Sequence, residues 1–160
     1  MKYILMLCLI AIIMVISQGV CNQYRERYAL YESLGEFFRQ MRLNLGFQKQ
    51  KIQQILTQTS LKRSNKDIYN AYLNYLNNGV GLDLTFIKVL DDNEQQQMSN
   101  MLYSLGKNDT SGELKQLDAY EVYLNDKIER TRAEKEKYCP LITKLSFLFA
   151  VGLAILFIWQ

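Results

Sequence analysis

Two short acidic stretches hold the residues whose types and spacing come closest to a catalytic or metal-binding site. Asp109, in the run Asp-Thr-Ser-Gly, could supply one carboxylate of the proton-sharing pair that aspartic proteases use. That chemistry needs two such carboxylates on a β-rich fold, and this chain has a single copy of the motif. We therefore expect Asp109, or Thr110 in a capping box with Glu113, to cap a helix instead.

The second acidic stretch, at residues 91–94, could hold a divalent cation through its carboxylate oxygens. Acidic residues are also favoured at helix N-termini, so we expect Asp92 to cap a helix with Gln95 as its capping-box partner. The chain has no histidine, which removes the commonest general base and metal ligand near neutral pH. We expect no enzymatic activity, no metal and no cofactor.

Three cysteines are present, and two of them flank the middle of the chain. Cys8 lies inside the first apolar segment, whereas Cys21 and Cys139 lie at the inner ends of the two apolar segments. These two cysteines could approach one another if the chain folds back. A disulfide would need an oxidising compartment, so we expect them to be small boundary residues.

The elements that must position all these residues lie between two apolar segments, at residues 3–16 and 145–159. A bilayer core of about 30 Å needs roughly 20 helical residues. Extending the first segment to Cys21 and starting the second at Cys139 reaches that length. We predict an N-terminal transmembrane helix at residues 1–21, a helical domain at 22–138 and a C-terminal transmembrane helix at 139–160.

The basic residues near the two apolar segments predict on which side of the membrane the middle domain lies. Arg25 and Arg27 follow the first apolar segment. Five basic residues come before the second apolar segment, namely Arg130, Arg132, Lys135, Lys137 and Lys144. Such residues stay in the cytoplasm, which places the middle domain there and both termini outside. The alternative is a cleaved signal peptide, with Lys2 as its charged start and small residues near position 19. The middle domain would then be exported.

Charge argues against a nucleic-acid partner. Residues 22–144 carry 18 of the 19 basic residues and all 16 acidic residues, a net charge of only +2. A nucleic-acid-binding domain of this size would be strongly basic. With about 120 residues, the middle domain is large enough for one modest hydrophobic core.

Apolar residues in the middle domain recur every three or four positions, which is the period of an α-helix. The first stripe comprises Tyr24, Tyr28, Tyr31, Leu34, Phe38, Met41 and Leu45. We expect Gly46 to end that helix, and Ile52, Ile55 and Leu56 to form the apolar face of the next. A third helix, with Ser64 as its N-cap, should end at Gly79.

Two further stripes complete the predicted bundle. The first consists of Met98, Met101, Leu102 and Leu105. The second lies on one long helix and consists of Leu114, Leu117, Tyr120, Leu124 and Ile128. Pro140 should kink or restart that helix. The predicted fold class is all-α, a cytoplasmic helical bundle flanked by an N-terminal and a C-terminal transmembrane helix.

One pattern resembles a known family. It consists of a Leu-Gly-x-x-Asp turn at residues 105–109, then Leu114, Leu117 and Leu124, a charged helix with Ala133 and Tyr138, and a closing apolar segment with Gly152. The chain resembles the stage III sporulation protein AB family, over nearly its whole length. That family resembles the inner-membrane platform protein of type II secretion and type IV pilus systems.

The resemblance implies a membrane platform in the channel between mother cell and forespore of endospore-forming bacteria. Its implied partners are a cytoplasmic secretion-type ATPase, other membrane channel components and the lipid bilayer. Its implied location is the mother-cell membrane around the forespore. Two alternatives remain open, a bacterial membrane-anchored helical scaffold outside sporulation and an exported helical protein with a cleaved signal peptide.

Two surfaces are the predicted docking sites for a partner. One is the turn at 105–109, with Leu105, Gly106 and Asp109. The other is the charged helix face at 129–137, with Glu129, Arg132 and Glu136. The structural alternatives are a helix hairpin, in which Gly106 is left-handed and Asp109 caps the next helix, and a solvated face with an Arg132–Glu136 ion pair.

Overall fold

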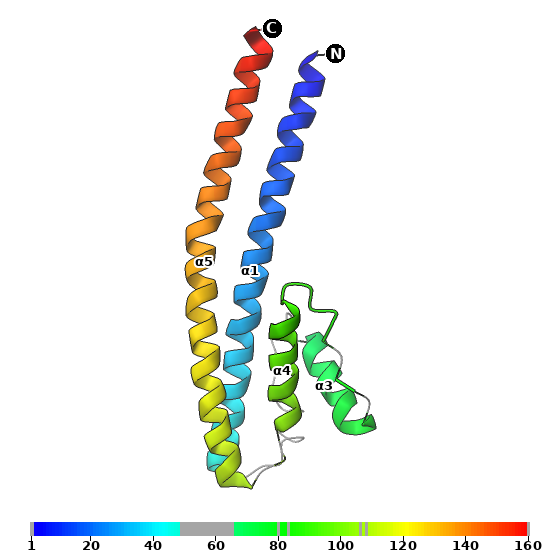
Figure 1. Cartoon of the computed structure of the whole chain (residues 1–160), viewed down its shortest axis with the longest axis vertical. Helices are drawn as coiled ribbons and strands as arrows, with labels where there is room; N and C mark the ends of the chain where they lie inside the picture. Colours follow the sequence, from blue (N-terminus) through cyan, green and yellow to red (C-terminus); the bar gives the residue numbers. More distant parts are fainter. Residues whose placement is uncertain are drawn as a thin grey trace. The chain divides into compact units, whose positions relative to one another are not determined.

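The computed structural model describes residues 2–48, 66–79, 81–82, 84–105, 107 and 109–159. These residues form four α-helices and no strand (Figure 1): α1 (Lys2–Gln48), α3 (Lys66–Asn78), α4 (Asp92–Ser104) and α5 (Thr110–Trp159). The predicted all-α class is confirmed. Two compact units divide the chain: unit 1 combines Met1–Tyr28 with Arg130–Gln160, and unit 2 is Ala29–Glu129.

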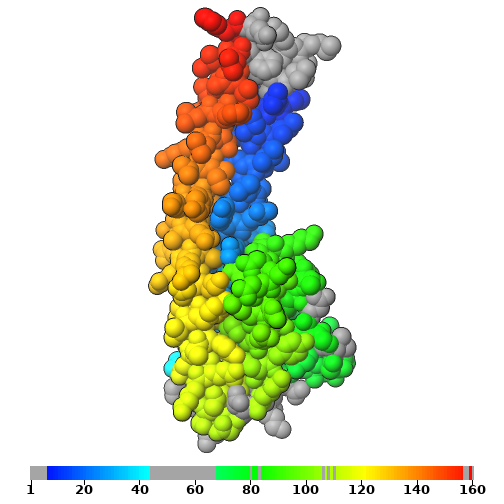
Figure 2. Space-filling view, in the orientation of Figure 1, coloured from blue at the N-terminus to red at the C-terminus, as the bar shows by residue number. Residues whose placement is uncertain are grey.

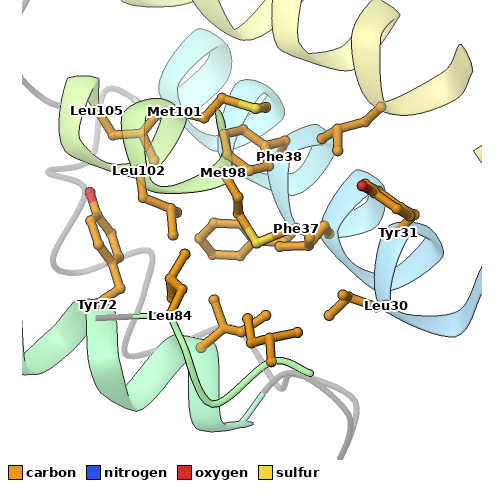
Figure 3. Close-up of a cluster of buried hydrophobic side chains, with 14 of the residues drawn as sticks. Leu30, Tyr31, Phe37, Phe38, Tyr72, Leu84, Met98, Met101, Leu102 and Leu105 are labelled. Carbon is orange, nitrogen blue, oxygen red and sulfur yellow. The ribbon is translucent and has the colours of Figure 1, made fainter. Parts of the chain in front are cut away.

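Unit 2 has one hydrophobic core, to which all four helices contribute (Figure 3). The α1 stripe is confirmed from Tyr31 to Met41, because Tyr31, Phe38 and Met41 are each at most 1% exposed. The side chain of Leu45 lies outside the described residues. On α5, Leu117 and Leu124 are buried, and Leu114, Tyr120 and Ile128 pack against the core. The predicted α4 stripe is also buried, and it comprises Met98, Met101, Leu102 and Leu105. The helical period therefore identified the core.

In unit 2, the start of α4 differs by one residue from the predicted cap, and the end of α3 agrees with the prediction. Asp91, not Asp92, is the N-cap of α4, because its side chain accepts the N–H of Glu94 at 2.7 Å. Asp92 is the first helical residue, and a negative charge is favourable at that end of a helix. Gly79 ends α3 as predicted. It has a φ of 64° and donates its N–H to the carbonyl of Tyr75 at 3.0 Å.

Two expected interruptions of the long helices are absent. Helix α1 continues past Gly46 to Gln48, since one glycine costs a helix only about 1 kcal/mol. The predicted apolar face at Ile52, Ile55 and Leu56, and the cap at Ser64, lie outside the described residues. Helix α5 continues through Pro140 without restarting. Proline removes one backbone N–H donor, and such a loss is tolerated in helices that cross a membrane.

In unit 1 the two ends of the chain pack antiparallel to each other. Cys21 and Cys139 each donate the thiol to the other's carbonyl at 3.5 Å. Further along, the rings of Tyr24 and Tyr138 stack at 5.6 Å. Figure 2 shows the side chains of the two helices in contact along this unit. The cysteines are free and close together.

Both long helices contain a segment that is long and apolar enough to cross a membrane, within Leu7–Leu43 and Ser111–Leu156. Only 11% of each apolar window is buried. The core helix of a soluble protein would instead bury most of its apolar face. The apolar surface is therefore consistent with a membrane protein. The predicted boundaries at residues 21 and 139 stay a prediction.

Candidate partner-docking site

The predicted docking turn at residues 105–109 is tied to the core at its first residue. Leu105 is buried, at 5% exposed, and donates its N–H to the carbonyl of Leu102 at 3.4 Å. Its burial agrees with its place on the predicted apolar stripe of Met98, Met101, Leu102 and Leu105. Gly106 lies outside the described residues. Leu105 therefore holds the turn against unit 2 and does not offer its side chain to a partner.

Asp109 caps helix α5. Its carboxylate accepts the hydroxyl of Ser111 at 2.7 Å and the N–H of Gly112 at 3.2 Å, while its carbonyl accepts the N–H of Glu113 at 2.8 Å. The hydrogen bond from Ser111, followed by that from Gly112, lowers the pKa of the Asp109 carboxyl. Thr110 is the first helical residue, so Asp109 and not Thr110 is the capping residue. Capping accounts for the Asp-Thr-Ser-Gly run without any acid–base chemistry.

The predicted charged face lies on α5, and its members are exposed. Arg132 donates to Glu136 at 2.9 Å in the predicted i,i+4 pair, and both side chains are about 60% exposed. The hydrogen bond to Glu136 is the main cause that raises the pKa of Arg132. Glu129 is also exposed and is the last residue of unit 2. These exposed charges could meet a partner, although an exposed ion pair adds little to stability.

A polar groove in unit 2 was not predicted from the sequence. It has a volume of about 400 Å³ and lies between α1 and α5, and its lining comprises Glu32, Gly35, Glu36, Arg39, Glu121, Asn125 and Ile128. Three carboxylates and one guanidinium face this groove. Beyond it, Arg42 pairs with Asp118 and with Glu121, the latter at 3.5 Å.

The groove depends on a close approach of its two helices. A Cβ atom at Gly35 would lie 2.8 Å from Cδ1 of Ile128, which is closer than unbonded carbon atoms pack. Glu32, Glu36 and Arg39 recur at helical spacing. This helical spacing could have indicated a polar surface on α1. It is a weak signal, because polar residues on one face of a helix usually contact only water.

The described residues contain no group of three or more His, Cys, Asp or Glu that could hold a metal ion. A model of the stage III sporulation protein AB family matches residues 2–158. The chain belongs to the stage III sporulation protein AB family. No curated protein and no solved structure matches it. Family membership implies a role in sporulation and partners within a sporulation complex, and the two apolar helices are consistent with a membrane protein of that process.

In this member of the stage III sporulation protein AB family, a partly buried ion pair joins two helices of unit 2. Lys127 Nζ lies 2.8 Å from Glu94 Oε1, and the two side chains are 22% and 5% exposed. The Lys127 ammonium also lies 5.9 Å from the ring centroid of Tyr31 and 5.8 Å from that of Tyr123. Burial is the main cause that raises the pKa of Tyr123. The pair joins α4 to α5 and has a structural role.

Proposed function

We propose that the chain is a non-enzymatic membrane platform of the mother-cell-to-forespore channel, and that its middle domain docks a secretion-type ATPase. Membership of the stage III sporulation protein AB family supports the sporulation part of this proposal. One structural observation carries the rest. Helices α1 and α5 each contain an apolar segment able to span a membrane and a stretch that lines the core of unit 2.

The backbone stays helical at both places where the chain passes from one unit to the other. A flexible linker would absorb a push from a bound partner, whereas a helix keeps its backbone hydrogen bonds and resists bending. Two helical connections therefore suit a protein that transmits the motion of a cytoplasmic ATPase to membrane channel components.

The polar groove between α1 and α5 is the proposed docking surface. Its lining has three glutamates against one arginine, and this net negative charge would attract a partner segment rich in lysine or arginine. The proposed location is the mother-cell membrane around the forespore, with the middle domain in the cytoplasm and both termini outside. The basic residues beside the apolar segments support that orientation.

The first experiment is an in-frame deletion in the source organism, scored for heat-resistant spores and forespore morphology. We expect development to stop after engulfment and the intact gene to restore it. Normal spores, or an organism that makes none, would reject the sporulation platform and leave a membrane-anchored scaffold of another process.

The second experiment tests docking with two matched double charge reversals. Glu32→Lys with Glu36→Lys alters the groove, and Glu129→Lys with Glu136→Lys alters the charged face of α5. Full-length protein is purified from sporulating cells, and the co-purified ATPase is measured. Loss of the ATPase with the groove variant alone is the expected result. Loss with the face variant alone would move the docking surface to the charged face, and loss with neither would reject docking at both surfaces.

A further inference from the structure

Four cations in unit 1 have no carboxylate partner. Glu134 and Glu136 pair with Arg27 and Arg132, at 3.8 Å and 2.9 Å. Four other basic residues of this region, Arg25, Lys135, Lys137 and Lys144, form no ion pair with a carboxylate of the described part of the chain. We name these four residues the basic collar.

Tyrosine rings hold two of the collar cations. Lys135 Nζ lies 3.8 Å from the ring centroid of Tyr28, and Lys137 Nζ lies 5.3 Å from that of Tyr138. Tyr138 itself stacks on Tyr24. Tyrosine and basic residues are the side chains that favour the boundary between lipid tails and water. The collar therefore has the composition of a headgroup-level belt.

The packing of unit 1 sets the depth of the collar. Cys21 and Cys139 meet at the inner ends of the apolar segments. Arg25 follows Cys21 by about one helical turn, or roughly 6 Å along the axis. The headgroup layer is about 5–8 Å thick on each side of a bilayer, so Arg25 falls within it. Lys144 lies on the apolar side of Cys139, and its long side chain can extend back to the same layer.

An apolar groove begins on the membrane side of the collar. Its volume is about 430 Å³, and it lies between α1 and α5 with the lining Ile13, Ile16, Ser17, Val20, Ile142, Leu145, Ser146 and Phe149. A hydrocarbon tail matches this lining. A phospholipid would thus meet cations at its headgroup and an apolar groove at its acyl chain.

Charge in the chain is also segregated towards this region. Residues 22–28 and 130–144 carry seven basic and three acidic residues, whereas unit 2 carries 11 basic and 13 acidic residues. The excess positive charge is therefore next to the apolar segments and not in the core-forming unit.

We propose that the basic collar binds the phosphate groups of anionic phospholipids and enriches them around this protein. The proposal requires that the apolar segments cross the membrane, and it is independent of any ATPase contact. Each basic residue near an anionic bilayer surface raises binding by about fivefold. Four such residues would select an anionic lipid over a zwitterionic lipid with the same tails.

The test uses the full chain in nanodiscs with equal amounts of phosphatidylglycerol and phosphatidylcholine of matched tails. Native mass spectrometry of the released protein gives the ratio of the two lipids that remain bound. We expect phosphatidylglycerol to be preferred. The variant Arg25→Gln, Lys137→Gln, Lys144→Gln should lower this preference by at least about tenfold.

Two control variants accompany the test. Lys88→Gln with Lys107→Gln and Lys115→Gln removes the same charge from unit 2, and it should keep the wild-type preference. Arg25→Lys with Lys137→Arg and Lys144→Arg keeps the collar charge, and it should keep the preference too. Equal preference in the collar-neutral variant and the unit 2 variant would overturn the proposal. A second measurement compares inorganic phosphate with phosphatidylglycerol in neutral detergent. If both raise the melting temperature equally, the collar binds free phosphate, and the proposal is overturned.

Discussion

Replacing Lys127 by methionine removes the cation of the buried pair with Glu94 and keeps most of the apolar stem. Breaking a buried ion pair from one side costs about 3–5 kcal/mol, because the other charge remains buried. Glu94 is 5% exposed and Lys127 is 22% exposed. Water therefore reaches the lysine end, and we place the loss in free energy of unfolding at about 2–3 kcal/mol.

The loss should appear as a large shift in thermal unfolding. For a domain of about 100 residues, 1 kcal/mol corresponds to roughly 4–8 °C, so we expect Lys127→Met to lower the melting temperature by roughly 10–20 °C. Circular dichroism of the full chain in neutral detergent, with urea unfolding of the same samples, measures both quantities. Lys88→Met is the matched control, because Lys88 is exposed, and it should change stability by less than about 0.5 kcal/mol.

A double-mutant cycle isolates the pair itself. Glu94→Gln removes the buried charge, so adding it to Lys127→Met should restore part of the stability, with a coupling energy of at least about 1 kcal/mol. A Lys127→Met protein that unfolds within about 0.5 kcal/mol of wild type would refute the reasoning. It would mean that water solvates Glu94 in the folded protein.

Three further predictions test other contacts. Oxidation with copper phenanthroline should join Cys21 to Cys139 within one chain, seen as a faster band on a non-reducing gel that Cys139→Ser abolishes; a wild-type band that does not shift would contradict the antiparallel packing of unit 1. Gly35→Val should destabilise unit 2 by about 1–3 kcal/mol through overpacking, and adding Ile128→Ala should recover part of the loss in urea unfolding; no recovery would show that Ile128 is not the neighbour that clashes. Asp109→Ala should lower the melting temperature at pH 7, whereas Asp109→Asn, which also caps a helix, should lower it less. Because folding lowers the pKa of Asp109, its carboxylate stabilises the protein at pH values above the ordinary pKa of about 3.9, and this contribution is lost as the pH falls through the folded-state pKa. An Asp109→Ala protein whose loss in melting temperature does not shrink in acid would contradict the cap.

The sequence predicted the core of unit 2 because burial follows a helical period. Tyr31, Phe38, Leu117 and Leu124 are all buried on the predicted stripes. The caps were predicted within one residue, since Asp91 and Asp92 have the same side chain and only the backbone decides which one lies outside the helix.

Contacts between distant segments could not be predicted in the same way. Glu94 and Lys127 are 33 residues apart, and nothing in their local sequences marks them as partners. The glutamates of the polar groove have the spacing of an ordinary solvated helix face, and only the closeness of Gly35 to Ile128 reveals a hollow between two helices. Continuation of α5 through Pro140 likewise departs from the rule that proline ends a helix.

The division into units also sets an order in which the chain can fold during synthesis. Unit 2 is one continuous stretch, Ala29–Glu129, whereas unit 1 is made of the two ends of the chain. A continuous stretch can close its core while the remaining residues are still being made. Cys21 must wait for Cys139, which is synthesised 118 residues later, and contacts across long loops form slowly. The first apolar helix therefore spends much of synthesis without its partner, and the contact between the two termini is the last to form.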